Sequence, residues 1–186
     1  EVSVKEMVGA FSIYANKGVY NAPMMVTKIE DKYGNVLANF YPESREVITE
    51  NTAFLMANLL QGVGDEGTGR RLRFRYGFKN QIGGKTGTTQ NHSDGWFIGI
   101  TPDLAGGVWV GAEDRSIHFQ NLANGQGASM ALPIWALFMQ KVYADKSLAV
   151  PQSDFQKPNG VNHVLDCGDA DREGMTDYDS SDEIFD

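Results

Sequence analysis

The chain has 186 residues, of which 41% are hydrophobic and 22% charged, and this length is enough to bury one sizeable core. Its formal net charge of −8 lies in the C-terminal part, because residues 1–150 hold 14 acidic and 14 basic side chains whereas residues 151–186 hold 10 acidic and 2 basic. The neutral charge of residues 1–150 argues against nucleic-acid binding. The difference in charge between the two parts predicts one globular domain over 1–150 and an acidic, largely disordered tail over 151–186.

A capping box marks the beginning of the first helix. Ser3 and Glu6 have the spacing of that motif, apolar residues then recur at helical intervals, and Gly18 is placed to end the helix. Two strands are predicted next, over 25–30 and 36–40. The polar, glycine-containing connection between them is typical of a hairpin, and we see no chemistry in this part.

A second helix and a basic stretch follow. Thr49 can cap the helix, and Gly62 and Gly64 are predicted to end it. Residues 70–85 then contain six basic side chains and no acidic one. Two interpretations stay open for this stretch: a positive rim beside Lys85 that attracts a carboxylate-bearing substrate, or a solvated loop whose arginines pair with nearby acids.

Three strands are predicted in the middle of the chain, over 80–88, 95–100 and 107–112. The second and third share the pattern Gly-x-aromatic-x-Gly, with Phe97 and Trp109 as the aromatic residues. Glycines beside an aromatic side chain leave room for a helix to pack closely. We therefore expect both faces of this sheet to be buried between helices.

A long helix is predicted over 128–143, with Pro133 near its first turn, and it should cover this sheet. The order of elements predicts an α/β chain of the α+β type, in which helices cover an antiparallel sheet. The apolar face of the long helix is expected to consist of Leu132, Trp135, Leu137, Phe138 and Val142.

The most distinctive stretch is Gly-Gly-Lys-Thr-Gly-Thr-Thr at residues 83–89. Its glycines let another molecule approach the backbone, and Lys85 and three threonine hydroxyls suit the binding of an anionic group. A phosphate-binding P-loop would need a glycine at position 79 and a following helix, but Lys79 stands there and a strand-like run follows. A glycine-rich hairpin with a solvated lysine is the plainer alternative.

A longer pattern around this stretch resembles a known family. Gly-Lys-Thr-Gly-Thr-Thr at 84–89, Asp-Gly-Trp-Phe-Ile-Gly at 94–99 and Thr-Pro-Asp at 101–103 closely resemble the carboxy-terminal part of the transpeptidase domain in class A penicillin-binding proteins. The resemblance covers roughly residues 1–162 and implies a partial penicillin-binding/β-lactamase-like transpeptidase fold. Members of the family polymerise glycan with one domain, and with the other they cross-link stem peptides through a serine acyl-enzyme.

The resemblance also implies roles for individual residues. Lys85 and Thr86 would help to hold the carboxylate of the donor peptide or of a β-lactam, and Thr89 would belong to the same substrate-binding group. Gly87 would keep the strand flat against the substrate. The backbone N–H of Thr88 would be one of two oxyanion-hole donors. The free edge of the strand would take up the peptide as an added strand.

The sequence departs from the family pattern at the nucleophile. The family needs the motifs S-x-x-K and S-x-N, and neither occurs in the 186 residues. Ser93, in Ser-Asp-Gly, is a near miss that lacks the asparagine and follows Lys85 instead of preceding it. The chain also lacks an initiator methionine. We therefore expect it to be part of a larger protein and to be inactive alone.

The resemblance implies a parent protein of the cell envelope, on the periplasmic side of the inner membrane, that binds peptidoglycan stem peptides and β-lactams. The chain itself shows no stretch apolar enough to span a bilayer, and the single cysteine, Cys167, excludes an internal disulfide. The three histidines lack metal-ligand spacing, so we expect neither a metal nor a cofactor.

The resemblance also leads us to expect self-association through an exposed sheet edge. Two alternatives stay open. One is a related serine β-lactamase or D,D-carboxypeptidase. The other is a non-catalytic envelope-binding module with the acidic tail as its interaction segment.

Overall fold

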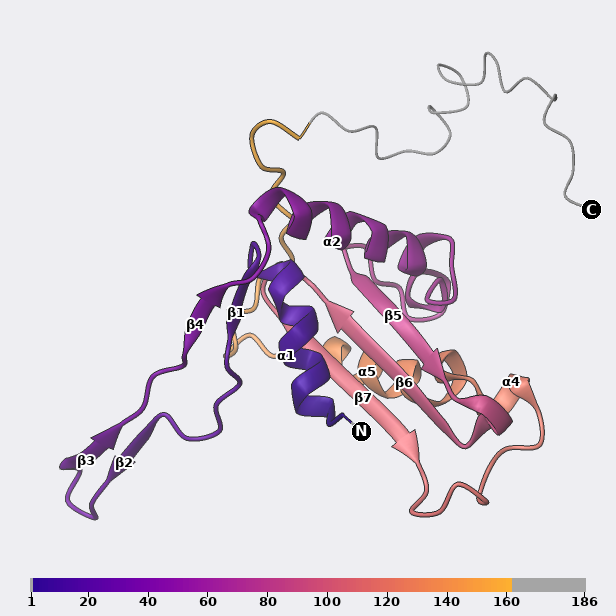
Figure 1. Cartoon of the computed structure of the whole chain (residues 1–186), viewed down its shortest axis with the longest axis horizontal. Coiled ribbons are helices and arrows are strands. Elements are labelled where there is room, and N and C mark those ends of the chain that lie inside the picture. Colours follow the sequence, from indigo (N-terminus) through magenta and orange to yellow (C-terminus); the bar gives the residue numbers. More distant parts are fainter. Residues whose placement is uncertain (1, 162–186) are drawn as a thin grey trace, which may run out of the picture.

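The computed structural model describes residues 2–161 and combines helices with antiparallel sheets, which confirms the predicted α+β class (Figure 1). Its elements are α1 (Val4–Ala15), β1 (Val19–Asn21), β2 (Lys28–Glu30), β3 (Val36–Asn39), β4 (Ser44–Glu46), α2 (Glu50–Asp65), α3 (Arg71–Phe74), β5 (Gly83–Thr88), the 3-10 turn η1 (Gln90–His92), β6 (Asp94–Ile100), β7 (Ala105–Gly111), α4 (Leu122–Gly125) and α5 (Gly127–Ala144).

The centre of the molecule is the three-stranded antiparallel sheet β5–β6–β7. The register pairs Gly83 with Ile100 and Thr88 with Gly95, so β5 and β6 match along their length. β6 lies between its two neighbours, and all but one of its residues are buried. The first of these strands begins three residues later than predicted, because residues 80–82 lead into the sheet without pairing.

Helices cover both faces of this sheet, which confirms the predicted sandwich. α5 packs on one face, where a Cβ added at Gly99 would lie 2.5 Å from the ring of Trp135. α1 packs on the other face, where a Cβ added at Gly107 would lie 2.6 Å from the side chain of Val8, and α2 lies beside α1 (Figure 1). The two Gly-x-aromatic-x-Gly repeats therefore face opposite helical layers.

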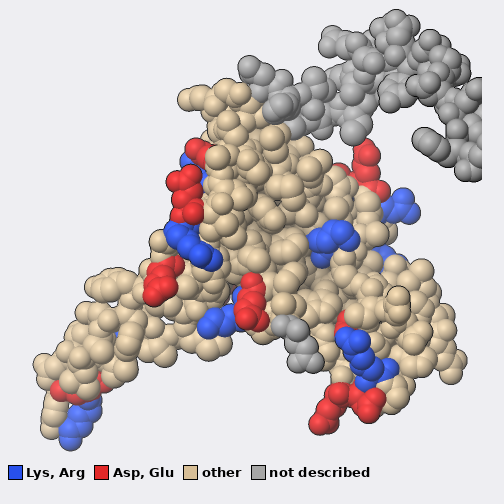
Figure 2. Space-filling view, viewed as in Figure 1, with Lys and Arg blue, Asp and Glu red and all other residues tan. Residues whose placement is uncertain are grey.

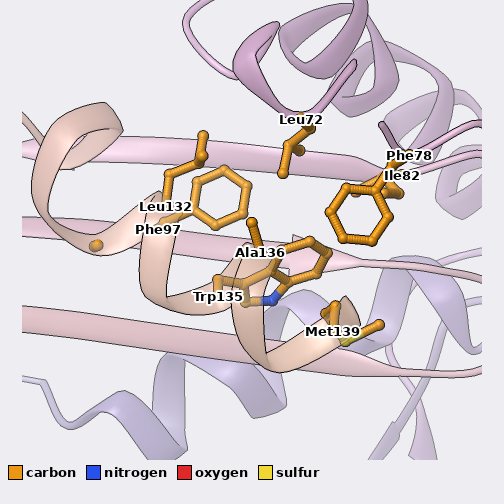
Figure 3. Close-up of a cluster of buried hydrophobic side chains, with 9 residues drawn as sticks. Leu72, Phe78, Ile82, Phe97, Leu132, Trp135, Ala136 and Met139 are labelled. Atoms are coloured by element: carbon orange, nitrogen blue, oxygen red, sulfur yellow. The ribbon is translucent and has the colours of Figure 1, made fainter. Parts of the chain in front are cut away.

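The main hydrophobic core lies between the sheet and α5 (Figure 3). The Trp135 ring meets Phe97 edge-on, with 5.3 Å between the ring centroids, and a tilted Phe78 at 6.2 Å. Such offset arrangements are the favourable ones for aromatic pairs. Leu72 of α3 and Ile82, just before β5, fill the side of the cluster (Figure 3). This core fixes the position of β5.

The helix caps agree with the sequence, but one predicted helix end is wrong. In α1, Ser3 Oγ accepts from the Glu6 N–H at 3.2 Å, and Glu6 Oε2 accepts from the Ser3 N–H at 2.7 Å. In α2, the Thr49 hydroxyl accepts from a backbone N–H in the first turn. α2 continues through Gly62 and Gly64 to Asp65. Gly64 is buried there, because a Cβ would lie 3.1 Å from the Ile82 carbonyl.

α5 covers the sheet as predicted, with two corrections. Pro133 is the seventh residue of the helix and lies beyond its first turn. The apolar face is also narrower than predicted, because Leu137 and Phe138 are 54% and 59% exposed. Only one strip of a straight helix can contact a flat sheet, and small residues such as Ala131 and Ala136 let that strip approach closely.

The predicted hairpin is confirmed, with shorter strands than expected. β2 and β3 pair antiparallel with an irregularity between Ile29 and Glu30, and the ribbon projects away from the body (Figure 1). The short strands β1 and β4 form its base and were not predicted. We call residues 22–43 the arm. Several large apolar side chains on it are exposed, among them Met25, Leu37 and Tyr41.

The first eleven residues of the predicted tail lie against the body. Phe155 donates its N–H to Gln81 Oε1 at 2.8 Å, and Ser153 Oγ donates to Asp103 Oδ2 at 2.6 Å. Val161 is buried. The rest of the predicted disordered tail, residues 162–186, lies outside the described residues. No helix within residues 2–161 combines the length and hydropathy of a membrane-spanning segment.

Candidate active site

The residues singled out in the sequence lie on β5, an outer strand of the sheet. No strand within residues 2–161 pairs with its other edge. Opposite residues in an antiparallel pair alternate between exchanging and not exchanging backbone hydrogen bonds. Thr89 donates its N–H to the Asp94 carbonyl at 3.3 Å, so the backbone groups of Thr86 and Thr88 point to the free edge.

Lys85 lies on the face of the sheet that α1 and α2 cover. Its side chain is exposed at a mainly apolar groove between β5 and α1, and Nζ donates to the outward carbonyl of Thr86 at 2.8 Å. The ammonium group is thus at the free edge, available to an anion that approaches there. The groove is lined by Val2, Met7, Phe11, Lys85, Thr86, Gly87, Trp96 and Ile98.

Thr86 lies on the opposite face, and its hydroxyl is held by a residue that the sequence analysis did not assign to the site. Thr68 Oγ1 lies 2.8 Å from Thr86 Oγ1, and either hydroxyl can be the donor. Thr68 belongs to the turn between α2 and α3. The contact joins residues 18 positions apart, and sequence spacing gives no signal for it.

The two threonines at the end of the strand use their hydroxyls within the body. Thr88 Oγ1 accepts from the Gly127 N–H at 3.0 Å and so ties β5 to the beginning of α5. Thr89 Oγ1 lies 3.0 Å from Ser93 Oγ and accepts from the Asp94 N–H at 3.1 Å. For Thr88, the outward backbone N–H is therefore the group open to a ligand.

Gly87 and Ser93 occupy tight positions beside these residues. A Cβ added at Gly87 would lie 3.0 Å from the Cβ of Trp96 on the neighbouring strand. Ser93, the near miss for a family motif, is buried, and its hydroxyl is already engaged by Thr89. The site residues brought to one edge are thus Lys85, Thr86 and the N–H of Thr88.

The basic stretch before β5 divides into two groups, so each earlier interpretation fits part of it. Arg71 donates to the Ala128 carbonyl and to Ser129 Oγ, both at 3.0 Å. Arg73 pairs with Asp65, with 2.7 Å from Nη2 to Oδ1. The exposed members, which form no ion pair within the described residues, are Arg70, Arg75, Lys79 and Lys85.

Basic side chains lie over β5 and beside the end of α2 on the face drawn in Figure 2, with acidic side chains nearby at the end of α2. The ammonium of Lys85 makes the free edge of β5 a place where an anionic, extended ligand could bind. Within residues 2–161, no three His, Cys, Asp or Glu side chains gather in a way that could hold a metal ion.

Comparison with known proteins gives a consistent result. Residues 1–128 match the family described as penicillin binding protein transpeptidase domain. The chain is 33% identical over 158 residues to penicillin-binding protein 1A of Aquifex aeolicus, covering 85% of this chain and 20% of that protein. It is 32% identical over 166 residues to penicillin-binding protein 2D of Bacillus subtilis, covering 86% and 22%.

Solved structures show the same fold. Penicillin-binding protein 1A from Haemophilus influenzae matches with a TM-score of 0.74 at 23% identity, over 85% of this chain and 28% of that one. PonA1 from Mycobacterium tuberculosis matches with a TM-score of 0.68 at 24% identity, over 83% and 41%. The chain thus spans about a fifth of the length of the curated relatives given above.

Proposed function

Because this chain belongs to the penicillin-binding protein transpeptidase family, we propose that it supplies the substrate-binding strand of a peptidoglycan D,D-transpeptidase. The parent protein would be a bifunctional cell-wall synthase of class A, which also polymerises glycan. Its ligands would be peptidoglycan stem peptides and β-lactams, and its place would be the cell envelope, on the periplasmic side of the inner membrane.

The observation that carries this proposal is the open edge of β5 with the Lys85 ammonium beside it. An extended peptide added at this edge would find the outward N–H and C=O groups of Thr86 and Thr88. Lys85 and the Thr86 hydroxyl flank the strand and would hold a carboxylate through charge-assisted hydrogen bonds. The Thr88 N–H would stabilise negative charge that develops on the attacked carbonyl oxygen.

A nucleophile is the missing part of this machinery. The 186 residues contain neither S-x-x-K nor S-x-N, and the serine nearest the strand, Ser93, is buried. The apolar groove beside Lys85 leaves room for a further segment to pack between α1 and β5. We infer that the acylating serine comes from a part of the parent protein outside this chain, and that the chain alone is inactive.

Labelling by a fluorescent penicillin tests the proposal. Loss of the catalytic serine lowers turnover in serine hydrolases on the order of a million-fold, so the 186-residue chain should acquire no label. The full-length gene product should be labelled. There, Lys85→Ala should slow acylation about 10- to 100-fold, the loss expected for a hydrogen bond to a charged group.

Lys28→Ala serves as the matched control, because Lys28 lies on the arm and pairs with Glu30, and labelling should be unchanged. A penicilloyl adduct found by intact mass on the 186 residues alone would overturn the assignment of roles. It would show that a serine of this chain, such as Ser93 beside the strand, is a nucleophile.

We further infer that copies of the isolated chain associate through the outer edge of β7. No strand within residues 2–161 pairs with that edge, and an open edge invites a strand of another chain.

A further inference from the structure

We propose that Thr68 positions the Thr86 hydroxyl so that its proton points to the carboxylate of a ligand bound at β5. Thr68 is then a positioning residue for the anion-binding part of the site. This role rests on the proposed function, in which Thr86 helps to hold that carboxylate. Its basis is the contact between the two hydroxyls, with 2.8 Å from Thr68 Oγ1 to Thr86 Oγ1.

The turn that carries Thr68 is fixed against the end of α2 by the two glycines that flank it. A Cβ added at Gly67 would lie 2.9 Å from Val63 Cα, and one added at Gly69 would lie 2.9 Å from the Val63 carbonyl oxygen. Gly69 also donates its N–H to that oxygen at 2.8 Å. Because neither position has room for a side chain, the turn lies closely on α2, and this contact defines the position of Thr68.

The same turn passes around the outer edge of β5. α2 precedes the turn and lies on the face of the sheet that α1 covers, where a Cβ added at Gly83 would lie 3.1 Å from Leu60 Cβ. α3 follows the turn and places Leu72 in the core on the opposite face. The turn therefore brings Thr68 beside Thr86 on the outer strand. Thr68 is exposed there, and Thr86 is half-buried.

The number of available protons decides the direction of the hydrogen bond between the two threonines. A threonine hydroxyl has one proton to donate and can also accept, whereas a carboxylate only accepts. When Thr86 donates its proton to a bound carboxylate, it has none left for Thr68. Thr68 must then be the donor in the 2.8 Å contact. Donation to an oxygen that itself donates strengthens the second hydrogen bond, which here is the one to the ligand.

The consequence is a preference for ligands that carry a carboxylate. The Lys85 ammonium beside Thr86 attracts an anion but imposes little direction, because it is a compact charge with rotatable donors. The oriented hydroxyl of Thr86 adds that direction. A neutral ester gains less from it, since hydrogen bonds to charged groups are the stronger ones.

Acylation of the full-length gene product tests the role of Thr68. Second-order rates are measured for benzylpenicillin and for its methyl ester, each in competition with a fluorescent penicillin. Thr68→Val removes the hydroxyl and keeps the shape of the side chain. It should slow acylation by benzylpenicillin about 3- to 10-fold, and acylation by the methyl ester by less than about twofold.

Three further variants control for the fold and for the substitution itself. Thr68→Ser restores a hydroxyl and should return the rate to within about twofold of the parent protein. Thr68→Ala, which also lacks the hydroxyl, should show the same losses as Thr68→Val, and circular dichroism checks that each variant is folded. Thr27→Val is the matched control, because Thr27 is an exposed threonine on the arm, and its rates should be unchanged.

A double-mutant cycle shows whether Thr68 acts through Thr86. Thr68→Val should slow acylation by benzylpenicillin in the parent protein but not in Thr86→Val, where no hydroxyl remains to be oriented. An equal loss in both backgrounds, or an equal loss with benzylpenicillin and its methyl ester in folded variants, would overturn the inference. Thr68 would then act only through the structure of the turn.

Two outcomes separate the role of Thr68 from the proposed function. A full-length protein that takes up no fluorescent penicillin would overturn both. A full-length protein that is labelled, and in which Thr68→Val has rates as unchanged as those of Thr27→Val, would overturn only the role of Thr68.

Discussion

The absence of a Cβ atom at certain glycines decides how closely the helices approach the sheet. At Gly99 in the centre of β6, an added Cβ would lie 2.5 Å from the Trp135 ring, a distance that real Cβ atoms do not reach. At Gly62 in α2, nothing lies within 4 Å of an added Cβ. The same substitution should therefore have opposite effects at these two positions.

Gly99→Ala should lower the free energy of unfolding by about 1–3 kcal/mol, because Trp135 or the strand must shift to make room. Gly62→Ala should raise it by about 0.5–1 kcal/mol, because alanine loses less backbone entropy in a helix. Urea unfolding of both variants against the parent chain measures the two effects. Equal destabilisation by both would contradict the packing described for α5 on the sheet.

A second effect at the residue scale involves Tyr143 of α5. Burial raises the pKa of its phenol above the ordinary 10.0, although hydrogen bonds with Asn80 and Thr101 act in the opposite direction. A raised pKa in the folded state means that the neutral phenol stabilises the fold below pH ~10. This stabilisation is lost as the pH rises through the folded-state pKa.

The free energy of unfolding of the parent chain should therefore fall as the pH rises above ~10, and it should fall less in Tyr143→Phe. The comparison uses urea unfolding at several pH values, with both chains tested at pH 7 as the reference. Phenylalanine keeps the ring contact with Phe78, whose centroid lies 6.2 Å away. Parallel pH profiles for the two chains would contradict the assignment to Tyr143.

At the scale of elements, the sequence correctly predicts the features that depend on residues close to one another in the chain. The caps of α1 and α2 depend on side chains within three residues of the helix start, and both are found where predicted. The end of α2 was wrong because Gly64 serves a distant contact with the segment before β5. β1 and β4 were missed because strands of three residues are too short to show an alternating pattern.

In the candidate site, too, the residues that are consecutive in the sequence could be predicted, whereas the contacts between distant residues could not. The glycines, lysine and threonines of β5 stand together in the sequence, so the strand could be recognised directly. Its partner Thr68 and the pairing of Arg73 with Asp65 depend on how α2, α3 and β5 pack. Only the folded structure separates the arginines that hold the body together from those that stay exposed.

The arm provides a test at the element scale. Two-stranded ribbons without a buried face are marginally stable, and none of the residues of β2 and β3 is buried. Amides of the arm, such as Ala38, should exchange at least tenfold faster than those of β6, such as Phe97 and Ile98. Hydrogen–deuterium exchange at the residue level measures this. Equal protection of the two regions would show that the arm is stabilised by contacts beyond those described.

At the scale of the whole molecule, two exposed apolar regions could drive association of the chain with itself. One is the outer edge of β7, where Trp109 is 41% exposed. The other is the arm, where Leu37 is 67% exposed. The two differ in what they offer a second copy. β7 is the rigid outer strand of a packed sheet with unpaired backbone groups, whereas the arm would have to lose conformational freedom on binding.

We therefore expect sedimentation velocity to show association that rises with concentration, and Trp109→Lys to weaken it about tenfold or more. Lysine on an edge strand opposes pairing because its charge would have to be buried, and the substitution also removes the apolar area of the indole. Leu37→Lys adds the same charge to an even more exposed apolar position on the arm and should leave the association unchanged. The reverse result would place the contact on the arm, and a chain that stays monomeric at the highest concentration would contradict pairing through β7.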